Sequence, residues 1–213
     1  LARQYSSDFD QACAPYQYAL STRAGTDCAT HLIRAHTDAD PSCTLVSIDG
    51  IGAFDHIQRA RMINKLMSMP KASALVPYVM LAYGHASQYV WTDDEGVAHD
   101  IHQGEGGEQG DALMPALYAL AQHGALADAS ARLQPGEVLL AYLDDVYVLC
   151  RPERAVTVFE IVADALRRGA GVEVNLGKCR IWNRGGIEPP RVAELGSGVW
   201  VGGAGSRCRG DQS

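Results

Sequence analysis

The alternation of apolar and polar residues predicts a chain of short strands and helices. A buried strand that ends in an acid is predicted at 44–49, where Thr44-Leu45-Val46-Ser47-Ile48 precedes Asp49. Two apolar runs, 138–141 and 146–149, flank Asp144-Asp145 and predict a hairpin. Further strands are predicted by short apolar runs around turns, at 88–92, 97–101, 172–174 and 179–182.

Helical spacing of apolar residues predicts helices between these strands. They cover 26–35, 56–69, 72–83 and 111–129, and Pro70 ends the second of these. A further helix is predicted to begin at Pro152 and to end near Gly169 or Gly171. Pro77 is a candidate kink. Asp111 is a candidate N-cap, with Pro115 in the first turn, where its missing N–H costs little. The order of elements favours an α+β domain, with helices on one face of a mainly antiparallel sheet.

Composition is typical of a globular domain rather than a disordered or membrane-spanning chain. Of the 213 residues, 47% are hydrophobic and 20% charged, and no apolar run reaches the length of a membrane span. The N-terminus is no secretory signal, so we expect an intracellular protein, in the nucleus or the cytoplasm. The six cysteines form no C-x-x-C pair, which favours reduced thiols. Because Leu1 is not an initiator Met, we expect a piece of a longer protein.

The net charge of −7 argues against a simple basic nucleic-acid-binding surface. The charge is uneven, because residues 151–210 carry ten Lys and Arg against six Asp and Glu. A chain that holds metal ions with carboxylates, and whose basic partner domains lie elsewhere, would show this balance.

The hairpin acids Asp144 and Asp145 are the most informative residues. Burying an ionised carboxylate in apolar surroundings costs several kcal/mol unless something pairs with it. A divalent cation such as Mg²⁺, which prefers carboxylate oxygens and substrate phosphates, is one candidate partner. The alternative is an ordinary turn with both acids in water, since hairpin turns favour Asp, although usually beside a Gly.

Asp49 adds a third carboxylate if its strand neighbours the hairpin. The three acids would then converge at one sheet edge and could hold two divalent cations for phosphoryl transfer. The glycine-rich segment 104–110 is predicted to be a flexible loop that lets the backbone approach a ligand, with Gln109 offering an amide.

Four ordered motifs resemble those of reverse transcriptases, most closely the non-LTR retrotransposon type. Residues 47–55, Ser-Ile-Asp-Gly-Ile-Gly-Ala-Phe-Asp, resemble motif A, and residues 109–115, Gln-Gly-Asp-Ala-Leu-Met-Pro, resemble motif B. Tyr142-Leu143-Asp144-Asp145 matches motif C, and residues 171–178, Gly-Val-Glu-Val-Asn-Leu-Gly-Lys, are similar to motif D. Residues 17–26 loosely resemble a fingers segment of the family, Gln-x-Gly-Phe-Arg-x-Gly-x-Ser/Thr.

The resemblance implies a right-hand polymerase palm that acts as an RNA-directed DNA polymerase. It implies partial fingers at 1–41, a palm at 42–184 with helices interleaved at about 56–105, and an irregular tail at 185–213 without a recognisable thumb. The implied partners are an RNA template, a primer DNA or RNA–DNA hybrid, and dNTP, with no membrane. Thumb and endonuclease regions are expected in the full-length polyprotein.

The resemblance also assigns residue roles. Two Mg²⁺ ions, with Mn²⁺ as an alternative, would be held by Asp49, the Gly50 carbonyl, Asp144 and Asp145. Lys178 would assist the leaving pyrophosphate as a fourth catalytic residue. The implied substrate-binding residues, beside Gly50, are Phe54 as a block to the ribose 2′ hydroxyl, Gln109, Gly110 and, more weakly, Arg23. Asp55 and Asp111 would be caps or structural hydrogen-bond partners.

Departures from the family pattern leave other functions open. Met114 replaces the usual small polar residue of motif B, and without a thumb the isolated piece is not expected to polymerise efficiently. One alternative is a non-catalytic or degenerate palm fragment that binds nucleic acid or a partner. A lower-ranked alternative is the palm of an RNA-dependent RNA polymerase, which usually carries an Asp at the position of Phe54.

Overall fold

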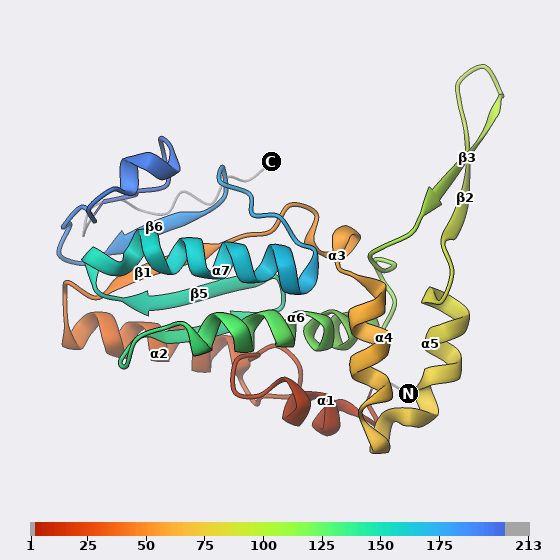
Figure 1. Ribbon diagram of the computed structural model, residues 1–213, viewed down its shortest axis with the longest axis horizontal. Coiled ribbons are helices and arrows are strands. Elements are labelled where there is room, and N and C mark those ends of the chain that lie inside the picture. The colour runs from red at the N-terminus through yellow and green to blue at the C-terminus, as the bar shows by residue number, and fades with distance from the viewer. Residues whose placement is uncertain (1–2, 203–213) are drawn as a thin grey trace.

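Four strands form the central sheet of the computed structural model, which describes residues 3–202 (Figure 1). Their order across the sheet is β4-β5-β1-β6, and every neighbouring pair is antiparallel. The strands are β1 (Thr44–Ile48), β4 (Val138–Tyr142), β5 (Asp145–Cys150) and β6 (Arg180–Asn183). The predicted α+β class, with a mainly antiparallel sheet, is confirmed.

Both edges of this sheet are covered by short extended segments. The Tyr18 N–H donates to the Ala141 carbonyl of β4 at 2.9 Å, and the Ala141 N–H donates to the Tyr16 carbonyl at 2.8 Å. At the other edge, the Ile181 N–H of β6 donates to the Val199 carbonyl at 2.7 Å. Because unpaired edge strands promote aggregation, these segments complete the sheet.

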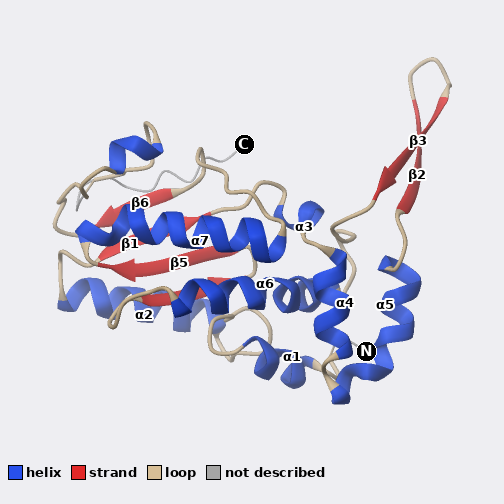
Figure 2. Ribbon diagram, in the orientation of Figure 1, coloured by secondary structure: helices blue, strands red, loops and turns tan. Residues whose placement is uncertain are grey.

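Two helices, α6 (Met114–Ala131) and α7 (Ala155–Ala170), pack together and bury one face of the sheet against the main core. Every second strand residue points toward them, among them Val46, Ile48 and Val148, all fully buried. In Figure 2, α7 crosses in front of β1 and β5, and α2 (Gly25–Ala39), which contacts β4, lies at the lower left, below β5. The alternate residues, including Ser47 and Tyr147, face away from the core.

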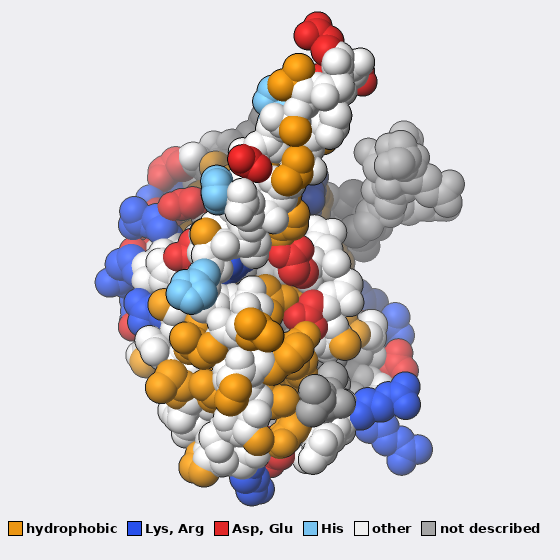
Figure 3. All heavy atoms as spheres, turned by 90° about the vertical axis from the view of Figure 1, so that its right-hand side faces the viewer, with side chains coloured by type: hydrophobic (Ala, Val, Ile, Leu, Met, Phe, Trp, Pro, Cys, Tyr) orange, Lys and Arg blue, Asp and Glu red, His pale blue; other side chains and the backbone are white. Residues whose placement is uncertain are grey.

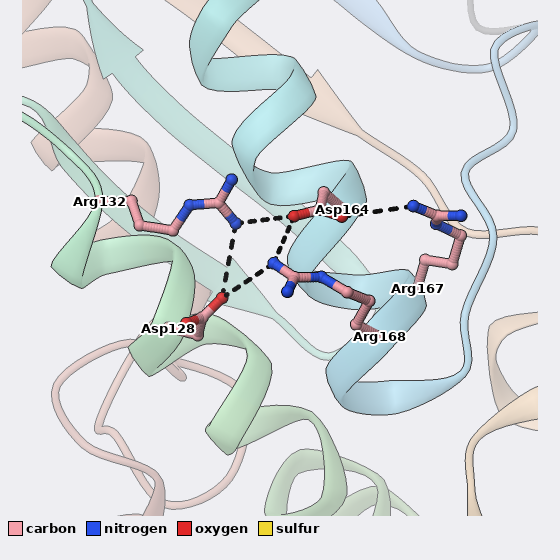
Figure 4. A network of polar contacts seen from close by, with 5 residues as sticks. All are labelled: Asp128, Arg132, Asp164, Arg167 and Arg168. Atoms are coloured by element: carbon pink, nitrogen blue, oxygen red, sulfur yellow. Dashed lines mark hydrogen bonds and ion pairs between the residues drawn. The ribbon is translucent and has the colours of Figure 1, made fainter.

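Ion pairs also join α6 to α7 on their exposed sides (Figure 4). The Arg132 Nη1, at the C-cap of α6, lies 2.9 Å from the Asp164 Oδ2 of α7, and Asp164 also pairs with Arg167 and Arg168. Because the groups are solvent-exposed, each pair adds little by itself. Burial of apolar surface therefore dominates the contact between these two helices.

The other end of the molecule is built from the remaining helices and a separate hairpin (Figure 1). The helical elements are α1 (Ser6–Cys13), α3 (Ala53–His56), α4 (Arg59–Met67), a 3₁₀ turn at Pro70–Leu75 and α5 (Val76–Tyr83). The hairpin pairs β2 (Ser87–Thr92) with β3 (Ala98–Gln103) and projects away from the sheet. Hydrophobic side chains are exposed along this end, among them Leu81, Val90 and Trp91, and acidic residues gather at the hairpin tip (Figure 3). A two-stranded ribbon exposed on both faces has little core of its own, so its base contacts hold it.

Several predicted boundaries are wrong for local reasons. The predicted helix 56–69 is shorter, forming α4 at Arg59–Met67, and the separate turn α3 precedes it because the chain is extended at Ile57 and Gln58. Pro77 lies in the first turn of α5 and makes no kink. Helix α6 begins at Met114 with Leu113, not Asp111, at the N-cap.

The C-terminal predictions need further correction. Residues 172–174 form a single bridge, between Val174 and Gly50, rather than a strand. The tail contains a 3₁₀ turn at Val192–Leu195 and the edge segment beside β6, so its described part is more ordered than predicted. Residues 203–213, including Cys208, lie outside the described residues. Within residues 3–202 every cysteine is a free thiol, and no helix is long and apolar enough to cross a bilayer.

Candidate active site

Strand register brings Asp49 to the tip of the β4–β5 hairpin. Strand β1 pairs with β5 so that Ile48 lies opposite Val146. Continued by one residue, this register takes Asp49 to the position opposite Asp145, and the two are close enough for the Asp49 carboxylate to raise the pKa of Asp145. Both fall in the alternate positions that face away from the helical core, on the side of Ser47 and Tyr147. Acids almost a hundred positions apart are therefore neighbours at one end of the sheet.

Asp144 occupies the turn between the two hairpin strands. Tyr142 pairs with Asp145, which leaves a two-residue turn of Leu143 and Asp144. The backbone therefore forms the tight turn expected under the alternative of an ordinary hairpin turn. The acids are nevertheless only partly exposed, so they are not simply solvated turn residues.

Among the described residues, three acids and one lysine leave the site with net negative charge. Burial raises the pKa of Asp145, the Asp144 and Asp49 carboxylates raise it further, and Lys178 opposes them. Burial and the same three acids also raise the pKa of Tyr118 and of Tyr147. An added cation would relieve this repulsion.

Asp49 contains an unpartnered atom at this site. Its Oδ1 is buried and has no hydrogen-bond partner in the described part of the chain, and the Lys178 Nζ lies 3.9 Å away. Within residues 3–202, no three or more His, Cys, Asp or Glu side chains are already arranged around a metal position. Mg²⁺ usually binds one or two carboxylates, several waters and substrate phosphates, so it does not require such a protein cage. The unpartnered oxygen and the clustered acids therefore fit a cation shared with a phosphate.

Motif D packs against motif A through its backbone. The Ile51 N–H donates to the Glu173 carbonyl at 2.7 Å, and the Asn175 N–H donates to the Asp49 carbonyl at 2.8 Å. Gly50 lies between these bonds, and a Cβ there would come within 2.5 Å of the Val172 side chain. The bridge leaves the Gly50 carbonyl without a hydrogen bond from residues 3–202, and it brings Lys178 beside Asp49.

A second group of predicted residues lines one pocket of about 330 Å³. Phe54, Gln109 and Gly110 meet there, together with Glu108, Asp111, Met114 and Pro115. The Phe54 ring stacks on the buried Tyr118 ring, with centroids 4.5 Å apart and planes 12° apart. The stacking fixes the orientation of the Phe54 ring at the pocket wall.

Part of the glycine-rich loop is hydrogen-bonded to the segment that carries Phe54. Gly107 N–H donates to the Phe54 carbonyl at 3.0 Å, and Gly106 N–H donates to the Ile57 carbonyl at 2.8 Å. A Cβ on Gly106 would lie 2.2 Å from the Asp55 carbonyl oxygen. At Gly106 and Gly107 the close backbone approach is therefore to the protein itself, whereas Gly110 has open space beside it at the pocket.

Met114 and Asp111 are structural parts of motif B. The Met114 side chain is buried and packs where a Cβ on Gly107 would collide with its sulfur. Asp111 accepts hydrogen bonds from the Leu113 N–H at 2.9 Å and the Tyr83 hydroxyl at 2.6 Å. The predicted structural role of Asp111 is confirmed.

The structure does not bring Arg23 to either group. Arg23 lies in the exposed turn before α2, and its guanidinium makes no hydrogen bond or ion pair with the part of the chain described. Three residues with no predicted role do connect to the site, namely Gln17, Tyr118 and Gln122. Two signals pointed to them: Gln17 is the first residue of the segment that resembles the fingers motif, and Gln122 is a buried polar residue among the buried apolar positions of α6.

Comparisons with known proteins agree with this geometry. The model of the reverse transcriptase (RNA-dependent DNA polymerase) family matches residues 4–198. No curated protein matches the chain in sequence.

Solved telomerase structures share the fold. A Candida tropicalis apo telomerase truncated from its C-terminal domain is 12% identical, with a TM-score of 0.61 over 84% of this chain and 39% of that one. Candida albicans telomerase in complex with the TWJ fragment of telomeric RNA is 12% identical, with a TM-score of 0.59 over 84% of this chain and 34% of that one. This chain thus spans well under half the length of these structures.

Proposed function

The chain belongs to the reverse transcriptase family, and we propose that it is the catalytic core of an RNA-directed DNA polymerase. In this proposal the core transfers a nucleotide from dNTP to a primer 3′ hydroxyl on an RNA template. Residues 1–41 would belong to the fingers, 42–184 to the palm, and thumb and endonuclease regions would come from the rest of a longer protein.

The observation that carries the proposal is the register that brings Asp49 opposite Asp145, with Asp144 in the adjoining turn. Asp49 and Asp144 would hold the two cations, Asp145 would add charge beside them, and the Gly50 carbonyl would be a further ligand. Mg²⁺ or Mn²⁺ bound there would lower the pKa of the attacking hydroxyl and balance charge on the leaving pyrophosphate.

The pocket around Phe54 would hold the incoming nucleotide. The Phe54 ring is fixed by Tyr118, so it would exclude a 2′ hydroxyl rather than move aside. The Gly110 backbone, at φ +96°, and the Gln109 amide would lie along the nucleotide and template. Lys178 is 69% exposed and 3.9 Å from Asp49, so its ammonium could reach the pyrophosphate. No contact of Arg23 supports its predicted role on the triphosphate.

The source of the chain is proposed as a non-LTR retrotransposon, on the resemblance of its motifs. The likeness to telomerases is at 12% identity and supports the fold alone. An encoding reading frame that continues into thumb and endonuclease regions would support a retrotransposon.

Primer extension tests the activity. The full-length protein should extend a DNA primer on an RNA template with Mg²⁺, and Asp144→Asn should abolish extension without changing the fold. Asp128→Asn, at an exposed acid of the α6–α7 ion pairs, is the matched control and should remain active. Extension that survives Asp144→Asn would refute the proposed role and favour a nucleic-acid-binding fragment.

A further inference from the structure

The hairpin turn beside the candidate catalytic acids has an unfavourable backbone conformation. Leu143 has φ +53°, in the left-handed region, and Asp144 does not. A two-residue hairpin turn with positive φ only at its first position is of the kind that strongly prefers Gly there. For a bulky residue such as Leu, this conformation is rare and persists only where the surroundings impose it.

The side-chain amide of Gln17 binds the backbone of Leu143. Gln17 Oε1 accepts a hydrogen bond from the Leu143 N–H at 2.7 Å, and Gln17 Nε2 donates to the Leu143 carbonyl at 3.4 Å. One side chain, 126 positions away in the sequence, thus binds both backbone polar groups of the strained residue.

Gln17 is itself held on every side. It is 5% exposed, and its neighbours Tyr16 and Tyr18 pair with Ala141 in the adjacent strand. The Ala19 N–H donates to Oε1 at 3.4 Å, and Nε2 also donates to Gln122 Oε1 at 3.5 Å. Both donors and both acceptor positions of the amide are therefore used.

The same contacts extend to the nucleotide pocket. Gln122 is fully buried, and its Nε2 donates to the Tyr118 hydroxyl at 3.3 Å. The Tyr118 ring in turn stacks on Phe54. A continuous buried path thus joins the turn that carries Asp144 to the ring that lines the pocket.

We propose that Gln17 is a positioning residue that holds the Leu143 turn in its left-handed conformation and so sets the directions of Asp144 and Asp145. Gln17 would touch neither metal nor substrate, and its effect on catalysis rests on the proposed function. A glutamine that merely filled the core could be replaced by methionine, which has similar length and no hydrogen-bonding amide.

Hydrogen exchange of this chain tests the contact between Gln17 and the Leu143 turn without measuring enzymatic activity. In Gln17→Met the Leu143 amide should exchange at least about tenfold faster, while amides of α7 stay unchanged. Gln134→Met, at a glutamine with no side-chain hydrogen bond in the described structure, is the matched control and should change nothing at Leu143. Unchanged exchange of the Leu143 amide in a folded Gln17→Met variant would overturn the proposal.

A rescue experiment tests the consequence for the acids. Gln17→Met should weaken Mn²⁺ binding, measured by electron paramagnetic resonance, and lower kcat of the full-length protein by about 10–100-fold. Adding Leu143→Gly should restore most of both losses, because Gly adopts positive φ without strain. Adding Leu143→Ala shortens the same side chain but keeps the strain, so it should restore neither.

The outcomes separate this proposal from the proposed function. If adding Leu143→Gly increases the losses of Mn²⁺ binding and kcat, or leaves them unchanged, positioning through the turn is refuted. If Gln17→Met alone does not fold, recovery of folding by Leu143→Gly and not by Leu143→Ala supports the proposal, and equal failure of both refutes it. If Asp144→Asn leaves extension intact, the proposed function fails, while the exchange result still decides whether Gln17 clamps the turn.

Discussion

Replacing Arg59 by Met should loosen the base of the projecting hairpin and disturb the nucleotide pocket at the same time. Arg59 is 4% exposed, and its guanidinium donates to the Gly106 carbonyl at 2.8 Å, the His85 carbonyl at 2.7 Å and the Ser87 hydroxyl at 2.9 Å. Methionine keeps the apolar stem and removes all three donors, which leaves acceptors at the hairpin base without partners.

The expected magnitude follows from these three bonds. A hydrogen bond from a charged donor contributes about 1.5–3 kcal/mol, and part of this total is offset because the variant no longer buries a charge. We expect a net loss of about 2–4 kcal/mol in the free energy of unfolding, or roughly 5–15 °C in Tm for a chain of this size. Because the loop that Arg59 holds also bonds the Phe54 carbonyl, KM for dNTP should rise as well.

Urea unfolding followed by circular dichroism, with primer-extension kinetics on the full-length protein, measures both effects. Arg61→Met is the matched control, since Arg61 lies on the same helix, is exposed, and its guanidinium makes one 3.3 Å hydrogen bond within residues 3–202, to Gln58. Equal unfolding midpoints for the two variants would refute the argument that these bonds hold the hairpin base.

Two further predictions concern the pocket and the surface. Phe54→Ala should raise incorporation of ribonucleotides relative to deoxyribonucleotides, measured as the ratio of kcat/KM values; an unchanged ratio would mean that the ring only fills space. Hydrogen bonds from Arg132, then from Arg168, hold the pKa of Asp164 below its usual range. The stability that Asp164 contributes should therefore be complete above the unfolded carboxylate pKa of about 3.9 and disappear as the pH falls through the lower folded value. Urea midpoints of the wild type and Asp164→Asn should differ at pH 7 and converge near pH 2; a difference that persists in acid would contradict the assignment.

Elements set by local pattern were predictable from the sequence. The apolar run at 44–48 forms β1, the runs around Asp144 and Asp145 form the β4–β5 hairpin, and Gly171, at φ +77°, caps α7 near the predicted closure. These features depend on burial periodicity and on glycine conformation, which short windows of sequence contain.

Features set by distant contacts were not predictable in this way. The break between α3 and α4 accompanies bonds from Gly106 and Gly107, some fifty residues later in the chain. Residues 172–174 were expected to form a strand, but they make a single bridge to Gly50, and the Val172 N–H donates instead to the Leu166 carbonyl of α7. The contact of Gln17 with Leu143 depends on pairing of the N-terminal segment with β4, and a motif match drew attention to Arg23 instead.

Binding of Mn²⁺ in the presence of dNTP, measured by electron paramagnetic resonance, tests most directly whether Asp49 and the hairpin acids act together. If they share the cations, Asp49→Asn and Asp144→Asn should each reduce binding by at least about tenfold, and Asp128→Asn should leave it unchanged. Full binding by a folded Asp49→Asn variant would contradict a shared site at this end of the sheet.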